Sequence, residues 1–340
     1  MTNSLVLKEA LSIPSVIGKF AFSDKNPYQE IADLINQKKI KYIVTIARGT
    51  SDCAALYSSY IFAKYLGLPS YSMPPSIITL EKSKFNFSEA LVIVISQSGK
   101  SGDLIECEKK SQEFGAITML ISNNENSPII NSANYFFNMF AGVEKSVAAT
   151  KSFVQTLLIL KKLVFICQGK QKINDNIKLL SDMLLKDANN QWSIDLVDNS
   201  INSGFILGRG VGFALSNEMS LKFKELCQEM IEPFSSAEVM HGPKSLIQDT
   251  FKVFTLSMND KSGLTVQNDS NEITKYTKLV YNISSAKDQS KNFYFPPNQI
   301  TEFDSIVIMS KFYPWIVRYT QNKGLDPDKP RYLTKVTQTF

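Results

Sequence analysis

Residues Leu91–Asp103, LVIVISQSGKSGD, contain the transition that decides the fold. Leu91–Ile95 is a run of five apolar residues, four of them β-branched, which predicts a buried strand. The turn Ser96–Gly99 follows, and apolar residues at helical spacing begin at Leu104. This layout is typical of phosphate sites, because a helix N-terminus offers unpaired N–H groups and serine hydroxyls donate further hydrogen bonds. The same residue types also form ordinary turns and N-caps, so the loop alone leaves both interpretations open.

A second unit of the same kind precedes this one. Tyr42–Ala47 (YIVTIA) predicts a strand, Arg48–Asp52 (RGTSD) a turn, and Cys53–Tyr65 a helix. More short strands are expected at Tyr71–Met73, Ile117–Ile121 and Tyr135–Phe137, with helices such as Asp103–Phe114 between them. Strands that alternate with helices predict βαβ units and a parallel sheet, in which ligands bind at the carboxyl ends of the strands.

Helical patterns surround this first sheet and connect it to a second one. They are expected at Leu5–Ala21 (interrupted by Pro14), at Tyr28–Gln37, from about Ser152 to Cys167, and at Ile177–Leu185. The strand–turn–helix pattern then repeats at Gly204–Leu207, Gly208–Gly210 and Ala214–Met230, with strands at Val253–Ser257, Leu279–Ile283 and Ile306–Met309. The second copy has Thr255–Asn259 (TLSMN) where the first has its hydroxyl-rich turn. We therefore expect only the first copy to bind a phosphate.

The predicted fold class is α/β, with two tandem domains built on parallel sheets flanked by helices. The expected boundaries are 1–168 for the N-terminal helices and the first domain, 169–190 for a helical linker, and 191–322 for the second domain. Residues 323–340 contain too much proline and charge for a sheet or helix, so they predict a C-terminal tail.

Composition excludes several classes of protein. The 340 residues are 44% hydrophobic and 20% charged, as in a folded globular protein. A net charge of +5 without a long basic run argues against nucleic acid as a partner. The N-terminus does not resemble a signal peptide, and no apolar run approaches the roughly 18 residues of a membrane span, so a cytoplasmic location without membrane association is expected. Four scattered cysteines and one histidine predict free thiols in a reducing compartment and no metal site.

Three further residues could take part in proton transfer. Lys222 and Glu225 are three positions apart on one helical face, where such pairs are usually solvated ion pairs. His241 precedes Gly242-Pro243, so a loop presents it, and loop histidines are either exposed or available for proton transfer. Lys335 is expected in the tail, where most lysines are simply solvated.

Six motifs in order make the chain resemble the sugar isomerase (SIS) domain family. They are RGTS (48–51), SQSG (96–99), EKSVAATKSF (144–153), KFKE (222–225), AEVMHGP (237–243) and PRYLTKVT (330–337). The resemblance covers nearly the whole chain. It is to the isomerase half of glutamine:fructose-6-phosphate amidotransferase and to SIS-type glucosamine-6-phosphate deaminases and fructosamine-6-phosphate deglycases. It implies two flavodoxin-like SIS domains and a tail that closes over the active site.

The resemblance also implies a role for individual residues. Glu225 would move a proton between C1 and C2 of the open-chain sugar, His241 would open the ring, and Lys335 would assist ring opening or form an imine. Lys222 would be a supporting charge beside Glu225. The substrate would be bound by Thr50, Ser51, Ser96, Gln97, Ser98, Ser101 and the backbone of Val147. Such a site needs no metal and no cofactor, and in this family the histidine comes from the neighbouring subunit, which implies a homodimer.

The branch of the family is inferred from the places where the sequence departs from the amidotransferase pattern. The isomerase-like sequence begins almost at Met1 and the first cysteine is Cys53, so no glutaminase activity is expected. The tail is more similar to the deaminase and deglycase branch. Lys100 and Thr334 depart from the amidotransferase pattern, in the phosphate loop and before the tail lysine. The leading hypothesis is conversion of glucosamine 6-phosphate to fructose 6-phosphate and ammonia.

Two kinds of alternative stay open. One is a related enzyme, either a fructosamine-6-phosphate deglycase or a galactosamine-6-phosphate deaminase. The other is a non-catalytic sugar-phosphate regulator, since a fold alone does not imply an activity. A regulator of this kind usually has a DNA-binding helix-turn-helix, and no basic recognition segment precedes Tyr42.

Overall fold

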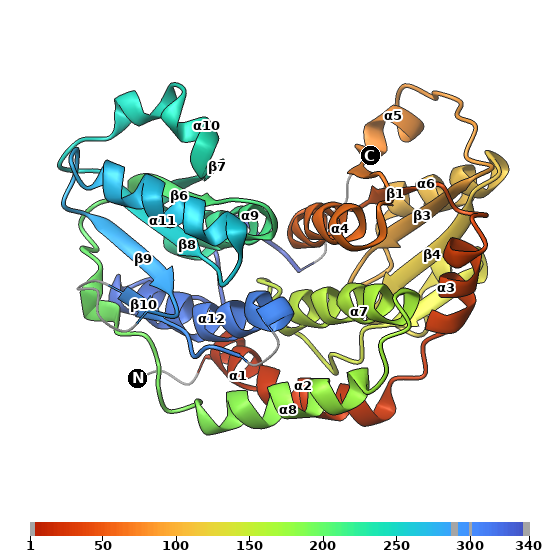
Figure 1. The fold of residues 1–340 in the computed structure, drawn as a ribbon, viewed down its shortest axis with the longest axis horizontal. Coiled ribbons are helices and arrows are strands. Elements are labelled where there is room, and N and C mark those ends of the chain that lie inside the picture. Colours follow the sequence, from red (N-terminus) through yellow and green to blue (C-terminus); the bar gives the residue numbers. More distant parts are fainter. Residues whose placement is uncertain (1–3, 287–291, 299–300, 336–340) are drawn as a thin grey trace. The chain divides into compact units, whose positions relative to one another are not determined.

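The computed structural model describes residues 4–286, 292–298 and 301–335 and divides the chain into two compact units. The sheet-1 unit comprises residues 15–144, 151–179 and 334–340, and the sheet-2 unit comprises residues 1–14, 145–150 and 180–333. Each contains one five-stranded parallel sheet flanked by helices (Figure 1). The predicted α/β fold class is confirmed.

The first sheet has the strand order β2-β1-β3-β4-β5. Every pair is parallel, and β3 is buried along its whole length, as expected for a central strand covered on both faces. Helices α3 and α4 pack against α7, and α5 packs against α6. The strands are β1 (Tyr42–Ile46), β2 (Ser70–Ser72), β3 (Ala90–Ile95), β4 (Ile117–Ser122) and β5 (Tyr135–Asn138), and the helices are α3 (Tyr28–Asn36), α4 (Thr50–Leu66), α5 (Pro75–Thr79), α6 (Gly102–Glu113), η1 (Pro128–Asn131) and α7 (Lys151–Cys167).

The second sheet repeats the first. Its order is β10-β9-β8-β6-β7, which is the same order when each sheet's strands are numbered from its own first strand. The N-caps after the two first strands, Gly49 and Gly210, also share backbone angles near φ 57°, ψ −131°, a conformation open essentially to glycine alone. The strands are β6 (Ser203–Gly208), β7 (Met230–Ser235), β8 (Lys252–Ser257), β9 (Val280–Ser284) and β10 (Asn292–Tyr294), and the helices include α9 (Val211–Lys222), α10 (Ser236–Met240), α11 (Lys261–Ile273) and α12 (Asp304–Asn322), with η2 (Ile194–Leu196), η4 (Pro243–Leu246) and η5 (Thr301–Phe303).

Two predicted elements of the second repeat are wrong. The run Ile306–Met309 is not a strand but part of α12, a helix buried on nearly all sides, so its apolar residues show no helical periodicity. The helix expected over Ala214–Met230 ends earlier. After α9 comes a π-helical segment η3 (Phe223–Cys227), and the left-handed Gln228 (φ +56°) stops it before β7 begins.

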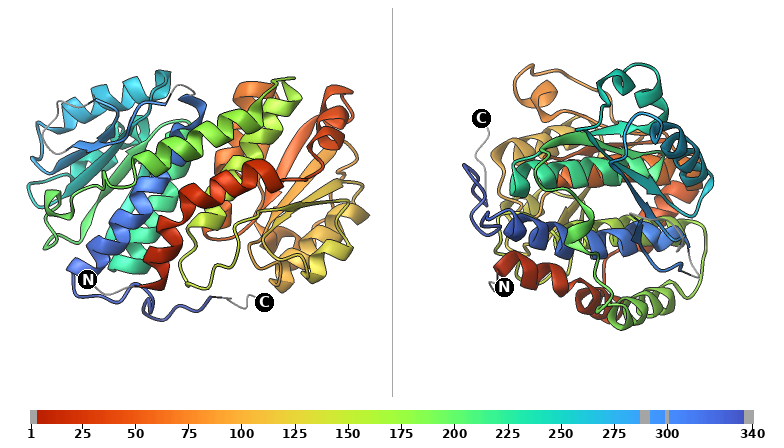
Figure 2. Two further views of the ribbon diagram at one scale, coloured as in Figure 1. Left: turned by 90° about the horizontal axis from the view of Figure 1, so that it is seen from below. Right: turned by 90° about the vertical axis from the view of Figure 1, so that its left-hand side faces the viewer.

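The chain enters and leaves the sheet-2 unit more than once. The predicted opening helix is two helices, α1 (Leu5–Leu11) and α2 (Ile13–Ser23), and a later helix, α8 (Ile173–Lys186), spans the expected linker. Helix α1 packs beside α12 (Figure 2). The carboxylate of Asp328 accepts hydrogen bonds from the backbone N–H groups of Leu5 (2.7 Å) and Val6 (2.9 Å). The tail therefore caps the first helix of the chain.

The cysteines fit the expectation of free thiols. No disulfide joins any of the four cysteines, and three of them are buried. Burial raises the pKa of Cys107, Cys167 and Cys227 to about 12, so these thiols stay protonated and unreactive. Among residues 4–286, 292–298 and 301–335, no helix is both long enough and apolar enough to cross a membrane.

Candidate functional site

The two predicted phosphate loops lie next to each other at the carboxyl edge of the first sheet. They follow β1 and β3, which are hydrogen-bonded neighbours with Ile46 opposite Val94. Thr50 and Ser51 form the first turn of the 17-residue helix α4. Ser101 is the N-cap of the 12-residue helix α6, but its side chain makes no capping hydrogen bond. Two long helices therefore begin where an anion would be bound.

Hydrogen bonds fix the loop Ser96–Gly99 on the side that faces the loop after β4. Ser96 Oγ accepts a hydrogen bond from the Gly99 N–H (3.1 Å). The carbonyl oxygens of residues 97, 98 and 99 accept hydrogen bonds from Asn123 N (3.1 Å), Asn124 Nδ2 (2.9 Å) and Ser127 Oγ (2.7 Å). Since these carbonyls face the loop after β4, they do not compete with an anion for the helix N-termini.

Gly99 is required at its position. Its φ of +61° lies in the left-handed region, and a Cβ built there would lie 2.0 Å from Ser127 Oγ. The two phosphate loops are also tied together, because Arg48 Nε donates to Asp103 Oδ2 at 2.5 Å. Arg48 is 44% exposed while Asp103 is buried, so the guanidinium stays at the surface of the loop. Lys100 is exposed in the same loop.

Lys222 and Glu225, expected as a solvated or a catalytic pair, form a largely buried ion pair in the sheet-2 unit. Lys222 Nζ lies 2.7 Å from Glu225 Oε2 and 3.2 Å from Oε1 of Glu218, a residue that the sequence analysis did not single out. The side chains of Lys222 and Glu218 are fully buried, whereas that of Glu225 is 23% exposed. Tyr313 donates its hydroxyl to Glu218 at 2.9 Å. The lysine is thus a fixed cation behind a partly open carboxylate.

The charges of this cluster depend on one another. Burial raises the pKa of the Glu218 carboxyl, and the nearby Lys222 ammonium reduces this effect. Burial by itself would lower the pKa of Lys222, but Glu218 and Glu225 outweigh it and raise that pKa, so Lys222 stays protonated. Glu225 lies in η3, and π-helical turns are rare and frequent at functional sites.

His241 was predicted to lie in a loop, and the structure places it at the C-terminal end of a short helix, next to the turn at Gly242. It is the C-cap of α10, its side chain is exposed, and its N–H donates to Glu238 O at 3.0 Å. Within the residues that the structure describes, no hydrogen bond or ion pair joins His241 to Glu225.

Val147 lies in a segment whose position is set by an unexpected residue. Glu9 of α1 is buried, and its carboxylate accepts hydrogen bonds from Lys145 N (2.6 Å) and Ser146 N (3.2 Å). It also accepts from the Ser146 hydroxyl. The role of Glu9 could not be predicted from the sequence, since a lone glutamate 136 positions before its partner leaves no local signal.

Lys335 lies near a carboxylate of the sheet-1 unit. Its Nζ is 3.6 Å from Glu144 Oε2, and its side chain is 25% exposed. Glu144 itself accepts hydrogen bonds from Ser152 N (3.2 Å) and Ser152 Oγ (2.5 Å) at the start of α7. The last two residues of the PRYLTKVT motif, Val336 and Thr337, lie outside the described residues.

The site residues thus fall into two groups, one in each compact unit. The sheet-1 unit contains Thr50, Ser51, Ser96, Gln97, Ser98, Ser101 and Lys335, and the sheet-2 unit contains Val147, Lys222, Glu225 and His241. The described part of the chain has no group of three or more His, Cys, Asp or Glu side chains arranged to bind a metal ion.

Comparison with known proteins finds similarity to proteins named for sugar-phosphate chemistry. The SIS domain model matches residues 34–165, which include both phosphate loops. A glutamine–fructose-6-phosphate aminotransferase (isomerizing) of Sulfolobus acidocaldarius is 30% identical over 303 residues, 86% of this chain and 49% of that protein. The enzyme of the same name from Fusobacterium nucleatum is 28% identical over 359 residues, 97% of this chain and 58% of that protein. The chain therefore spans about half the length of these curated relatives.

Solved structures share the fold over nearly the whole chain. A "putative phosphosugar isomerase" from Silicibacter pomeroyi DSS-3 superimposes with a TM-score of 0.85 at 27% identity, covering 96% of this chain and all of that one. Glucosamine-6-phosphate deaminase from Thermotoga maritima has a TM-score of 0.76 at 20% identity, covering 99% of this chain and all of that one, which shows a common fold.

Proposed function

Since the chain belongs to the SIS domain family, we propose that it is a sugar-phosphate isomerase and, more narrowly, a glucosamine-6-phosphate deaminase. The observation that carries the proposal is the pair Lys222–Glu225, a buried cation 2.7 Å from a carboxylate that is partly open to solvent. Aldose–ketose chemistry needs one base that removes a proton from one carbon and returns it to the next. A carboxylate fixed by a buried lysine meets that need.

The proposed reaction consumes water and needs no redox step. After ring opening, Glu225 takes the proton from C2 of the open-chain amino sugar and delivers it to C1. The aldehyde becomes an alcohol and the C2 amine becomes an imine, with a second proton passing from the nitrogen to O1. Water then adds to the imine carbon, and ammonia leaves as the C2 carbonyl of fructose 6-phosphate forms. The net change is glucosamine 6-phosphate plus water to fructose 6-phosphate plus ammonia.

The phosphate group would be bound at the carboxyl edge of the first sheet. Thr50 and Ser51 begin one helix there and Ser101 caps another, while the Ser96–Gly99 loop has its carbonyls turned to the neighbouring loop. Ser96, Gln97 and Ser98 would line the anion with N–H and hydroxyl groups. Val147, in the segment fixed by Glu9, would contact the sugar through its backbone.

His241 and Lys335 would act at ring opening. The exposed position of His241 at the end of α10 suits a residue that serves the active site of a second subunit, so we propose a homodimer with His241 shared across the interface. Lys335 would assist ring opening or form an imine with the ketose. Mixing Glu225→Gln chains with His241→Ala chains tests the shared site. Restored turnover in the mixture supports it, and full turnover by a monomer contradicts it.

The decisive experiment measures ammonia release from glucosamine 6-phosphate by the wild-type chain and by Glu225→Gln. A matched control is Glu232→Gln, because Glu232 forms an exposed ion pair with Lys224 and should leave turnover unchanged. Galactosamine 6-phosphate and a fructose–lysine 6-phosphate adduct are assayed in parallel. If only one of these two compounds is turned over, the proposed mechanism stands and that compound is the substrate.

A second assay separates the general proposal from the narrow one. Interconversion of glucose 6-phosphate and fructose 6-phosphate requires the same C1–C2 proton transfer but no amine. If this interconversion occurs and depends on Glu225, the chain is a sugar-phosphate isomerase whatever its amine chemistry. If no substrate is turned over while fructose 6-phosphate still binds, the result supports the non-catalytic regulator instead.

A further inference from the structure

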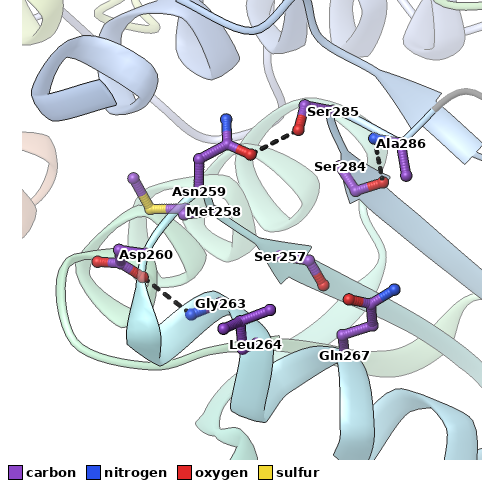
Figure 3. Close-up of a pocket in the computed structure, with 10 residues that line it drawn as sticks. All are labelled: Ser257, Met258, Asn259, Asp260, Gly263, Leu264, Gln267, Ser284, Ser285 and Ala286. Carbon is purple, nitrogen blue, oxygen red and sulfur yellow. Dashed lines mark hydrogen bonds between the residues drawn. The ribbon is translucent and has the colours of Figure 1, made fainter. Parts of the chain in front are cut away.

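A pocket lies at the carboxyl edge of the second sheet, at the position that corresponds to the phosphate loop of the first. It lies beside the ends of β8 and β9 and the start of α11, and its volume is about 240 Å³ (Figure 3). We call it the β8–β9 pocket. Its lining consists of Ser257, Met258, Asn259, Asp260, Gly263, Leu264, Gln267, Ser284, Ser285 and Ala286.

We propose that the β8–β9 pocket binds an uncharged polyhydroxylated molecule of the size of a free monosaccharide. The topology supplies the location, because β8 is the third strand of its sheet, as β3 is in the other. Parallel sheets bind ligands at the carboxyl ends of such strands. The residues supply the ligand class, and they differ from those of the first loop in two ways.

The first difference is charge. Asp260 Oδ1 accepts the Gly263 N–H at 2.9 Å, so a carboxylate already occupies the N-terminus of α11. In the first sheet the corresponding N-cap, Ser101, makes no capping hydrogen bond. None of the ten residues that line the β8–β9 pocket is basic. A phosphate bound there would meet the Asp260 carboxylate, and no residue of the lining would neutralise either charge.

The second difference is hydrogen-bonding capacity that the protein leaves unused. In the described part of the chain, neither the Ser257 hydroxyl nor the Gln267 amide has a hydrogen-bond partner, and both line the pocket. Ser257 stands opposite Ser284 at the ends of paired strands. Gln267 offers a donor and an acceptor, and the Ser257 hydroxyl can serve as either. Alternating donors and acceptors suit sugar hydroxyls.

The pocket walls are fixed before any ligand arrives. Asn259 is held by Asp304, which accepts from its side-chain amide at 2.8 Å, and by the Ser285 hydroxyl at 2.5 Å. At Gly263 an added Cβ would lie 1.9 Å from Met258 O, so loop and helix are in direct contact. Leu264, 63% exposed, adds an apolar surface for the C–H face of a sugar ring.

The probe is D-glucose, titrated calorimetrically into the full chain. A ligand of about 12 non-hydrogen atoms predicts a dissociation constant in the millimolar range. Gln267→Leu should weaken binding roughly three- to tenfold, as expected for the loss of one or two neutral hydrogen bonds. Leu264→Trp should abolish binding by filling the pocket. The control is Asn268→Leu on the exposed face of the same helix, which should bind as wild type does.

The outcomes are distinguishable from those at the proposed active site. Ser98→Ala alters the first loop, so it should weaken glucose 6-phosphate and leave free glucose unaffected. If Ser98→Ala abolishes glucose binding while Gln267→Leu and Leu264→Trp keep it, the sugar binds at the first loop and the proposal is overturned. It is equally overturned if no heat of binding appears up to about 100 mM glucose.

Discussion

The ammonium of Lys222 and the carboxylate of Glu225 lie 2.7 Å apart, yet the lysine is fully buried and the glutamate is not. A second carboxylate, that of Glu218, lies 3.2 Å from the lysine on its buried side. Because the ion pair with Glu218 also holds Lys222, its ammonium group stays in place. Glu225 is the member of the cluster that is open to solvent, and its counter-charge is fixed beside it.

Replacing Lys222 with methionine should destabilise the protein strongly. The change removes the cation from two carboxylates in contact with it, and breaking a buried pair in this way costs about 3–5 kcal/mol. Urea unfolding at neutral pH measures the loss. The matched variant Lys224→Met removes a lysine whose pair with Glu232 is exposed, so its free energy of unfolding should change by less than about 1 kcal/mol. Equal losses in the two variants contradict the structural role given to Lys222.

Asp304 should make stability depend on pH. Burial raises the pKa of its carboxyl from 3.8 to about 6 in the folded chain, with Asn259 opposing part of the shift. Between pH 4 and 6 the folded state therefore binds more protons than the unfolded state. Its contribution to stability is complete below about pH 4 and is lost as pH rises through 6, in total roughly 3 kcal/mol.

Asp304→Asn removes this dependence. Measured from pH 4 to 7, the free energy of unfolding of Asp304→Asn should increase relative to that of the wild type as pH rises. Asp175→Asn, a change at an exposed position of α8, should run parallel to the wild type. Parallel curves for all three proteins would show that the Asp304 carboxyl titrates normally.

Gly99→Ala should destabilise the phosphate loop by more than the cost of the left-handed backbone angle alone. Gly67→Ala is the matched control, because Gly67 has φ +67° and open space around it, whereas at Gly99 the new methyl meets Ser127. The left-handed conformation costs both variants roughly 1–2 kcal/mol. Gly99→Ala should lose more stability and bind fructose 6-phosphate more weakly, and Ser127→Gly in the same chain should restore part of both. Identical melting curves for the two alanine variants contradict this.

Glu9→Gln should loosen the segment that contains Val147. An amide offers one acceptor oxygen where the carboxylate offers two, so a backbone N–H of Lys145 or Ser146 loses its partner at a cost of about 1–3 kcal/mol. If Val147 contacts the sugar, KM rises more than kcat falls. Glu30→Gln, at an exposed position of α3, is the control and should change neither. An unchanged KM with lowered stability would limit Glu9 to a structural role.

Much of the fold could be predicted because the strand–loop–helix units are local. The strand at Leu91–Ile95 and its serine-rich turn are visible within thirteen residues, and β3 with the start of α6 was confirmed there. Ile306–Met309 was misassigned, because a short apolar run is the same in a buried strand and in a helix buried all round. Only the packing of α12 decides between the two.

The residues of the candidate site that could be predicted are those that belong to sequence motifs. Lys222 and Glu225 form a contact within one turn, so their pairing was visible in the sequence. Glu218 and Glu9 were missed for different reasons. The role of Glu218 depends on its complete burial, and that of Glu9 on a contact with a segment 136 residues away. Neither burial nor distant contact can be read from spacing.

The cap that Asp328 places on the first helix has a consequence for the order of folding. Helix α1 is synthesised roughly three hundred residues before the helix it packs against, α12, and before the carboxylate that closes its N-terminus. A seven-residue helix is not stable alone. Helix α1 therefore cannot dock until α12 and Asp328 have been made, and its docking follows synthesis of the second sheet.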